Sequence, residues 1–193
     1  MKSEDMRIAL INSAIHTISQ VGIDRATTKL LSGSIGVNEV YIYRIFGGKE
    51  ELFREAFKSI DKEFSAKLLQ LIPTMYHPRA DIKQRFKNYF YALWQYILED
   101  KEKYTFFIRY YYSRCYTINI TNDRKNIYAG VMEKFNLAFS YGTDTWWLFS
   151  YILDVLFSSA VKVLREEIPN NEETAEKIFE LLFAALQSHL KQI

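Results

Sequence analysis

Cysteine, proline and glycine are all scarce in this sequence, which limits cross-links and sharp turns. Its 193 residues include one cysteine, three prolines and seven glycines, while 16% of them are aromatic. The single cysteine, Cys115, excludes an internal disulfide and a metal site built from several cysteines, and it favours a reducing, cytoplasmic environment. Because few residues can break a helix and many side chains are large, we expect an all-α fold.

The residue groupings that catalysis or cofactor binding requires are also missing. His16, His77 and His189 lie far apart on separate predicted elements, and the sequence has neither an HExxH motif nor a glycine-rich phosphate loop. We therefore expect no metal, no cofactor and no enzymatic activity. An enzyme that uses an aromatic pocket is a minor alternative. An inert thiol is the favoured interpretation of Cys115, with a redox sensor as the alternative.

Neither a strong net charge nor a long uncharged apolar run is present. Lysine and arginine total 25 against 23 aspartates and glutamates, and residues 1–60 hold eight basic and seven acidic residues. Composition alone therefore does not indicate nucleic-acid binding. The most apolar run, residues 146–164, contains Asp154 and Lys162, so we expect no membrane span.

What the sequence does contain is helical periodicity interrupted by single glycines. Ile8, Ile11, Ile15 and Ile18 are predicted to form the apolar stripe of a first helix, which Gly22 ends. This spacing places the four isoleucines on one side of the helix, where they can pack against the helices that follow in the sequence.

Two short helices are predicted next, joined by a tight turn at Gly36. Thr27 is suited to cap the first of them, which carries Leu30 and Leu31, and Asn38 is suited to cap the second. The second short helix ends at the double glycine of residues 47–48.

A long helix over residues 49–72 and a larger helical body are predicted beyond the double glycine. Residues 115–122 have strand-like side chains but no partner strand, so we expect a loop there. Body helices are predicted near residues 80–99, 101–114, 123–141, 143–166 and 172–191, which makes about nine helices in all. The expected domains are residues 1–48, the connecting helix 49–72, and residues 73–193.

Two short helices joined by a glycine turn have the form of a helix-turn-helix, in which the second helix enters the major groove of DNA. At about 100° per residue, Ile42, Ile45 and Phe46 share one side of that second helix and can bury against the preceding helices. The remaining side chains, which face outward or sit at the helix start, are Val40, Tyr43, Arg44, Tyr41 and Glu39.

The two tyrosines have an alternative interpretation as aromatic core residues. Because Ile42, Ile45 and Phe46 already fill the inward side, an exposed contact surface is the favoured interpretation for Tyr41 and Tyr43. Tyrosine hydroxyls and an arginine suit phosphate oxygens, and residues at the start of a recognition helix reach base edges.

Residues 8–57 resemble the DNA-binding domain of the TetR family of transcriptional regulators. The resemblance consists of a glycine after the first helix, a Thr-Thr helix start, a Gly-Val turn, an aromatic second helix ending in Tyr-x-x-Phe, and Lys-Glu opening the long helix. These elements are Gly22, Thr27-Thr28, Gly36-Val37, Tyr43-Arg44-Ile45-Phe46, and Lys49-Glu50 with Leu52.

The resemblance implies a homodimeric, ligand-responsive DNA-binding protein, most often a repressor, whose last two helices form the dimer interface. The implied partners are a double-stranded DNA operator, a small-molecule effector, and a second copy bound through residues 143–191. The aromatic residues of the C-terminal body predict that this small molecule is apolar or aromatic. Buried core packing is the alternative explanation for the apolar helix over residues 143–166. The implied DNA-binding residues are Thr28, Asn38, Glu39, Val40, Tyr41, Tyr43, Arg44 and Lys49, with Thr28, Tyr43, Arg44 and Lys49 on phosphates.

Three positions depart from the family pattern. Glu39 and Val40 stand where the family commonly has Lys-Gly, and Ile35 stands where it has alanine. Glu39 could accept a hydrogen bond from a cytosine amino group, or its negative charge could weaken DNA binding overall. The alternative function is therefore a helical small-molecule binding protein that no longer binds DNA.

Aromatic residues are concentrated in the C-terminal body, where they can fill a core or line a ligand pocket. Aromatic side chains provide apolar surface together with hydroxyl or indole groups that orient a ligand. The residues predicted to line such a pocket are Trp94, Phe107, Tyr111, Trp147 and Tyr151.

Overall fold

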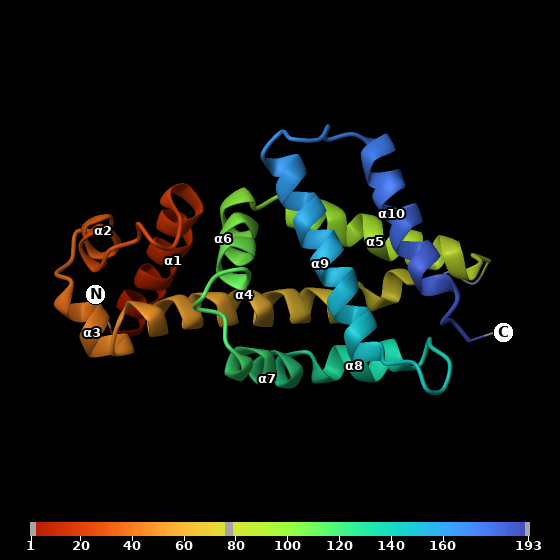
Figure 1. Ribbon diagram of the computed structural model, residues 1–193, viewed down its shortest axis with the longest axis horizontal. Helices are drawn as coiled ribbons and strands as arrows, with labels where there is room; N and C mark the ends of the chain where they lie inside the picture. The colour runs from red at the N-terminus through yellow and green to blue at the C-terminus, as the bar shows by residue number, and fades with distance from the viewer. Residues whose placement is uncertain (1–2, 76–78, 192–193) are drawn as a thin grey trace. The chain divides into compact units, whose positions relative to one another are not determined.

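The computed structural model describes residues 3–75 and 79–191, and the predicted histidine His77 lies outside these ranges. The described residues form ten α-helices and one 3-10 helix, so the all-α prediction is confirmed (Figure 1). One isolated antiparallel bridge joins Phe139 and Leu190. The elements are α1 (Ser3–Val21), α2 (Thr28–Gly33), α3 (Val40–Phe46), α4 (Lys49–Leu71), η1 (Ile72–Met75), α5 (Ile82–Leu98), α6 (Lys101–Tyr111), α7 (Ile118–Ile127), α8 (Ala129–Asn136), α9 (Thr145–Leu164) and α10 (Glu172–Gln187).

The chain forms two compact units. Unit 1 comprises Met1–Glu63 and Glu102–Lys125, and unit 2 comprises Phe64–Lys101 and Asn126–Ile193. Helices α4 and α7 each contribute residues to both units. The predicted domains follow chain order instead, and their boundaries stay a prediction.

Local chemistry in unit 1 positions α2 and α3 as the sequence predicts. The Thr27 hydroxyl accepts a hydrogen bond from Leu30 N at 3.2 Å, and Asn38 Oδ1 accepts one from Val40 N at 2.9 Å. Both bonds satisfy backbone N–H groups that a helix start leaves unpaired. Gly36 and Gly47 have φ angles of 69° and 81°, which a side chain would make unfavourable. These glycines therefore set the turns on either side of α3.

The predicted apolar stripe of α1 is wrong in its register. Ile18 is buried, but Ile8 is 52% exposed, whereas Leu10 and Ala14 are fully buried. Small side chains occupy this inward side, and the Ser13 hydroxyl donates to the Leu31 carbonyl of α2 at 2.7 Å. The isoleucines were predicted to face inward because they are the most apolar residues of α1. Small residues such as Ser13 and Ala14 face inward instead, because they allow α1 and α2 to approach closely.

The part of α4 in unit 1 packs as predicted. Leu52, Phe53, Ala56, Phe57 and Ile60 are buried at helical spacing. The ring of Phe57 stacks on Phe107 of α6 with centroids 4.6 Å apart. Aromatic packing of this kind adds to the free energy gained from burial alone.

A buried ion pair lies beside these rings. Arg124 Nε of α7 donates to Asp61 Oδ2 of α4 at 2.9 Å, and the two side chains are only 7% and 0% exposed. The Arg124 guanidinium also lies over the rings of Phe57, Phe107 and Tyr111 at 5.3 to 5.8 Å. Cation–π contacts partly replace the water that this guanidinium gives up.

The region around residue 120 corrects two predictions. Residues 118–122 are helical rather than a loop, and the single helix predicted over residues 123–141 is divided into α7 and α8. Ile120 is buried and Ser65 donates to the Ile127 carbonyl at 2.9 Å, so tertiary contacts stabilise a helix whose own residues favour strand. The described residues therefore contain ten α-helices instead of about nine.

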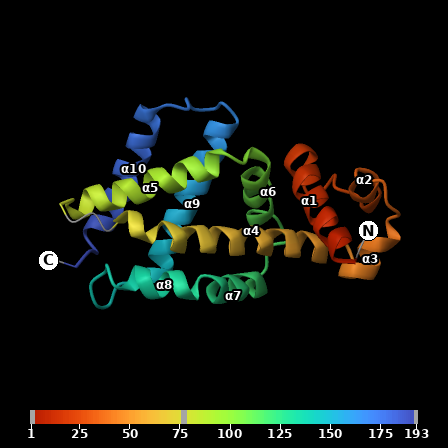
Figure 2. The same ribbon diagram turned by 180° about the vertical axis from the view of Figure 1, so that it is seen from behind.

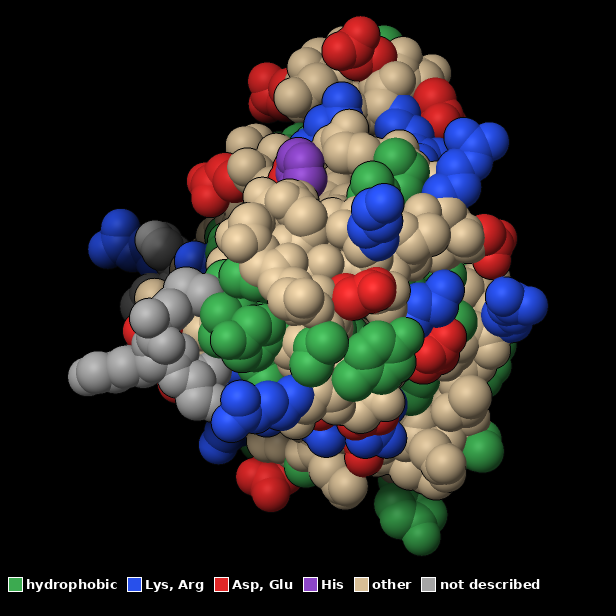
Figure 3. Space-filling view, turned by 90° about the vertical axis from the view of Figure 1, so that its left-hand side faces the viewer, with side chains coloured by type: hydrophobic (Ala, Val, Ile, Leu, Met, Phe, Trp, Pro, Cys, Tyr) green, Lys and Arg blue, Asp and Glu red, His purple; other side chains and the backbone are tan. Residues whose placement is uncertain are grey.

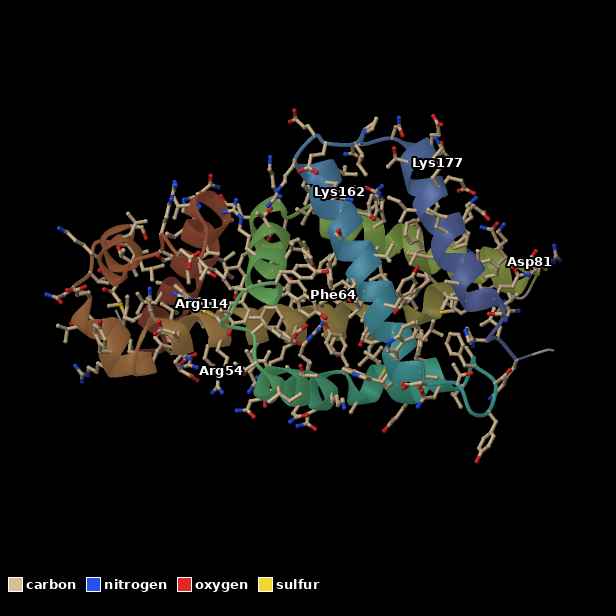
Figure 4. All side chains as sticks on the ribbon, viewed as in Figure 1. Arg54, Phe64, Asp81, Arg114, Lys162 and Lys177 are labelled. Carbon is tan, nitrogen blue, oxygen red and sulfur yellow. The ribbon has the colours of Figure 1, made fainter. Side chains whose placement is uncertain are left out.

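Unit 2 is built around α5, α9 and α10, which lie side by side in both ribbon views (Figure 2). Phe64 of α4 is labelled in Figure 4. Its ring packs on that of Phe157 of α9, with the ring centroids 4.9 Å apart. Lys87 of α5 donates to Glu176 of α10 at 2.8 Å, and the pKa of Glu176 is lowered chiefly by this bond. The caps are Asp81 on α5, Asp144 on α9 and Asn171 on α10.

Helix α9 is long and apolar enough to cross a membrane by length and composition alone. Its most apolar window is 44% buried within the protein. Leu153, Leu156 and Phe157 are buried among the helices of unit 2. The core helix of a water-soluble protein also has this length and composition, so these two properties alone are weak evidence for a membrane span.

Candidate nucleic-acid interface

Helix α3 separates its side chains into a buried side and an exposed side. Ile42 is fully buried and Phe46 is 7% exposed, whereas Val40 and Tyr43 are 62% and 56% exposed. Ile45, predicted to be buried, is half-buried. A two-turn helix thus presents a mixed aromatic and aliphatic surface while two of its residues hold it in the core.

Contacts from α1 and α4 fix the C-terminal end of α3. The guanidinium of Arg7 lies over the Phe46 ring at 5.0 Å, and Arg7 Nη2 donates to Glu55 Oε2 of α4 at 2.6 Å. Gly47 N donates to the Tyr43 carbonyl at 2.9 Å, which closes the last turn. These contacts hold the exposed side of α3 in one orientation.

The N-terminal end of α3 is organised by Asn38, Glu39 and Thr28. Asn38 caps the helix, and Glu39 makes no capping hydrogen bond of its own. Instead, the Thr28 hydroxyl at the start of α2 donates to Glu39 Oε2 at 2.7 Å. This bond ties together two residues predicted to contact DNA separately.

Some basic side chains of unit 1 form ion pairs and others do not. Arg7, Arg54 and Lys58 are neutralised by Glu55, Glu51 and Asp123 at 2.6, 2.6 and 3.4 Å. Within residues 3–75 and 79–191, by contrast, no ion pair involves Lys29, Arg44 or Lys49. Arg44 and Lys29 are exposed and Lys49 is partly exposed.

The space-filling view in Figure 3 shows basic, acidic and hydrophobic side chains intermixed, without a continuous field of one sign. Such a surface gives weak long-range attraction, so any DNA contact depends on individual cations and hydrogen-bonding groups. The exposed tyrosines, Arg44 and Lys49 supply such groups. Lys29 is an additional candidate that the sequence reasoning missed, although its place directly after Thr28 could have indicated it.

Unit 2 contains a partly open apolar cavity of about 90 Å³, formed by α4, α5, α8, α9 and α10. Tyr89, one of its lining residues, donates its hydroxyl to the Leu68 carbonyl at 2.8 Å, and burial raises the pKa of this phenol. The cavity is also lined by Phe86, Phe90, Val131, Phe135, Phe149, Phe179 and Phe183. These residues were not predicted from the sequence, because phenylalanines at helical spacing give the same pattern whether they line a cavity or fill a core.

None of the five residues predicted to line a pocket lines this cavity, and the five are divided between the two units. Trp94 is buried on α5, stacked on Phe90 at 5.8 Å. Phe107 and Tyr111 stack on each other in unit 1. Trp147 and Tyr151 stack at 6.1 Å on α9 and are 66% and 39% exposed.

No metal centre is indicated in the described part of the chain, where no group of three or more histidine, cysteine or acidic side chains is placed to hold an ion. His16 is a surface residue of unit 1, and its Nδ1 lies 2.9 Å from Glu102 Oε1. Cys115 is a free, half-buried thiol.

Comparisons with known proteins agree with this geometry. Residues 10–56 match the family model of bacterial regulatory proteins of the tetR family. This segment spans α1 from Leu10 onward, α2, α3 and the start of α4. No curated protein matches the chain in sequence.

Several solved structures share the fold over nearly the whole chain. A putative tetR family regulator from Shewanella sp. PV-4 has a TM-score of 0.76 at 15% identity, and the match covers 100% of both chains. A TetR family regulator from Marinobacter aquaeolei VT8 has a TM-score of 0.72 at 15% identity, covering 96% of this chain and 98% of that one. The regulator FadR from Bacillus subtilis, solved in complex with stearoyl-CoA, has a TM-score of 0.66 at 14% identity, covering 92% and 98%.

The matched segment coincides with the helix-turn-helix whose exposed side carries tyrosine and arginine. The fold of the rest of the chain is that of proteins described as regulators of the same family. Members of this family are transcription factors rather than enzymes. Residues 10–56, which contain α2 and α3, therefore match the tetR family of bacterial regulatory proteins, and the chain as a whole has the fold of solved regulators of that family.

Proposed function

We propose that this DNA-binding regulator is a cytoplasmic homodimer that represses transcription from an operator and leaves it when an apolar small molecule binds. The observation that carries the DNA-binding part is the division of α3, which buries Ile42 and Phe46 and exposes Tyr43 and Arg44. A helix held in this way can enter the major groove without rearrangement.

The proposed DNA contacts follow from the chemistry of the exposed groups. Cationic side chains neutralise phosphates, and tyrosine hydroxyls donate to phosphate oxygens. Residues at the start of α3 face the base edges. The proposed phosphate contacts are Lys29, Tyr43, Arg44 and Lys49, and the proposed base-facing residues are Glu39, Val40 and Tyr41, with Asn38 as the cap of α3.

The proposed dimer uses α9 and α10. Trp147 of α9 and Leu181 of α10 are 66% and 71% exposed, and Tyr151 stacks beside Trp147. Large exposed apolar side chains on neighbouring helices are typical of a surface that another chain covers. A twofold axis would place two copies of α3 about 34 to 36 Å apart, one helical turn of DNA.

The proposed effector site is the apolar cavity of unit 2. At about 90 Å³ it is smaller than the roughly 300 Å³ that ligand pockets usually provide, so a ligand must push its walls apart. The walls come from five helices, and one of them, α4, also carries residues of unit 1. An expanded cavity would thereby alter α4, and a ligand that prefers the altered state would release DNA.

The nature of the ligand is proposed from the lining, which is almost entirely aliphatic and aromatic. An elongated apolar molecule fits this chemistry, and FadR from Bacillus subtilis was solved with stearoyl-CoA. Mass spectrometry of the purified native protein should reveal such a molecule. The variant Val131→Phe, which fills the cavity, should abolish ligand binding while DNA affinity is retained, and Ile118→Phe on the exposed surface of α7 is the control.

Selection of genomic DNA fragments tests the proposed regulator as a whole. The purified protein should enrich a small set of fragments, each with two half-sites one helical turn apart. Reporter expression from an enriched fragment should fall when the protein is present and recover when the apolar ligand is added. Enrichment without half-sites, or expression that rises with the protein, would contradict the proposal of a dimeric repressor.

The alternative is a helical small-molecule binding protein without DNA binding. The exposed carboxylate of Glu39 at the start of α3 favours it, because a negative charge there repels phosphates. Failure to enrich any fragment, together with retained ligand binding, would support this alternative.

A further inference from the structure

The hydrogen bond between Thr28 and Glu39 joins the two helices of the helix-turn-helix on their exposed side. Thr28 Oγ1 donates to Glu39 Oε2 across 2.7 Å. Thr28 is the first residue of α2, and Glu39 immediately precedes α3. The bond therefore restrains the Glu39 carboxylate at the end of α3 where a recognition helix reaches base edges.

The Glu39 carboxylate is not needed to cap α3. Asn38 Oδ1 already accepts the hydrogen bond of Val40 N at 2.9 Å, and Glu39 makes no capping bond. One carboxylate oxygen accepts the hydrogen bond from the Thr28 hydroxyl, while the remaining lone pairs of the carboxylate stay available as acceptors. Glu39 is thus an oriented acceptor on the exposed side of unit 1.

Thr28 has one hydroxyl proton and cannot give it to two acceptors at once. Phosphate oxygens, like carboxylate oxygens, accept hydrogen bonds. While Thr28 donates to Glu39, it cannot also donate to a DNA phosphate. Its contribution to binding then acts through Glu39, which changes the role expected for it from the resemblance alone.

An acceptor in the major groove discriminates between bases. Cytosine presents an amino donor there, whereas guanine presents two acceptors and thymine presents an acceptor and a methyl group. Adenine presents an amino group beside the acceptor N7, so a carboxylate aimed at it meets a repulsive lone pair. Cytosine is the base that satisfies an oriented carboxylate best.

We propose that Thr28 and Glu39 act as one base-selecting unit, in which Thr28 positions the Glu39 carboxylate and Glu39 selects a cytosine in each operator half-site. This inference rests on the proposed DNA binding of the preceding section. Thr28 is a positioning residue in this account, and Glu39 is the residue that touches the base.

Selection from random double-stranded DNA, carried out with four proteins, tests the unit. The wild type should enrich cytosine at one position of each half-site. Glu39→Gln should move that preference to adenine, because a glutamine amide pairs with adenine N6 and N7. Thr28→Val, which keeps the side-chain shape and removes the hydroxyl, should reduce the discrimination at the same position by about tenfold. Thr28→Ser keeps a hydroxyl at this position and should therefore keep the base discrimination of the wild type.

Two results would overturn the inference. One is an unchanged base preference in Glu39→Gln. The other is a Thr28→Val protein that binds every sequence more weakly by the same factor, which is the behaviour of a lost phosphate contact. Circular dichroism and melting temperature show whether each variant is folded, and Thr28→Ser separates loss of the hydroxyl from loss of structure.

The outcome also distinguishes this inference from the function on which it rests. If the wild type selects no DNA sequence, the proposed operator binding fails and this inference fails with it. If the wild type selects an operator and all four proteins share its base preferences, operator binding stands and only the Thr28–Glu39 unit is refuted.

Discussion

At the level of single residues, neighbouring positions on α3 have opposite roles. Ile42 is fully buried while the adjacent Tyr43 is 56% exposed, and Phe46 is held under the guanidinium of Arg7. The buried residues determine where the exposed ones point. The contact surface is therefore a consequence of the packing beneath it, and single substitutions on the exposed side should change binding without unfolding the protein.

Arg44→Ala should weaken binding to all DNA sequences to a similar extent, because a phosphate contact carries no sequence information. The slope of log affinity against log salt concentration should become shallower by about 2, because each protomer of the dimer loses one phosphate contact. Fluorescence anisotropy with labelled duplexes measures both quantities. Lys62→Ala removes the same charge from an exposed position later on α4 and should leave the slope unchanged. Equal slopes for both variants would show that Arg44 does not contact phosphate.

Arg124→Met should destabilise unit 1, because it removes the ion pair that Arg124 forms with the fully buried Asp61. Removing one partner of a buried pair typically costs about 3–5 kcal/mol. Urea unfolding followed by circular dichroism measures the loss. The control is Arg114→Met, since Arg114 and Asp24 are 3.8 Å apart with 88% and 87% of their side chains exposed. Similar losses for both variants would contradict a structural role for the buried pair.

At the level of elements, the helix starts and the glycine turns could be predicted from the sequence, whereas the packing sides could not always be. Thr27 and Asn38 cap short helices as expected because a cap depends on nearby residues. The inward side of α1 was mispredicted because it depends on α2, a partner that periodicity does not reveal. The helical structure of residues 118–122 was mispredicted for a similar reason, because contacts with residues distant in sequence stabilise α7.

The prediction of a ligand pocket shows the same limit. Trp94, Phe107 and Tyr111 were selected because their segments are rich in aromatics, yet Trp94 and Phe107 are buried in the cores of different units and Tyr111 is half-buried. The cavity arises where five helices leave space between them. Such a space depends on the distances between helices, which no local pattern encodes. The exposed side of α3 was easier to predict, because it follows from the periodicity of one short helix.

Gly36→Ala should destabilise the helix-turn-helix, because residue 36 has a φ of 69° that alanine adopts poorly. The expected loss is about 1 kcal/mol. Gly33→Ala is a matched control: Gly33 ends α2 without a positive φ, and no atom lies within 4 Å of an added Cβ. Thermal unfolding should give a lower melting temperature for the first variant and an unchanged or higher one for the second. Equal melting temperatures would contradict the strain argument.

At the level of the whole molecule, the proposed mechanism requires a dimer. Leu181 of α10 and Ile118 of α7 are equally exposed, at 71% each, but only Leu181 lies on the proposed interface. Leu181→Glu should dissociate the dimer into monomers, because a carboxylate would be buried at the interface. Ile118→Glu should leave the dimer intact. Sedimentation velocity distinguishes the two, and a monomeric wild type would contradict the interface.

The salt dependence of operator binding tests the central claim most directly. With Lys29, Arg44 and Lys49 of each protomer on phosphates, the slope of log affinity against log salt concentration for the dimer should be about −5. The measurement uses a selected genomic fragment and the wild-type protein between low and moderate salt. A steep linear decrease near this value agrees with a DNA-binding helix-turn-helix. Absence of binding, or affinity that does not change with salt, would contradict it.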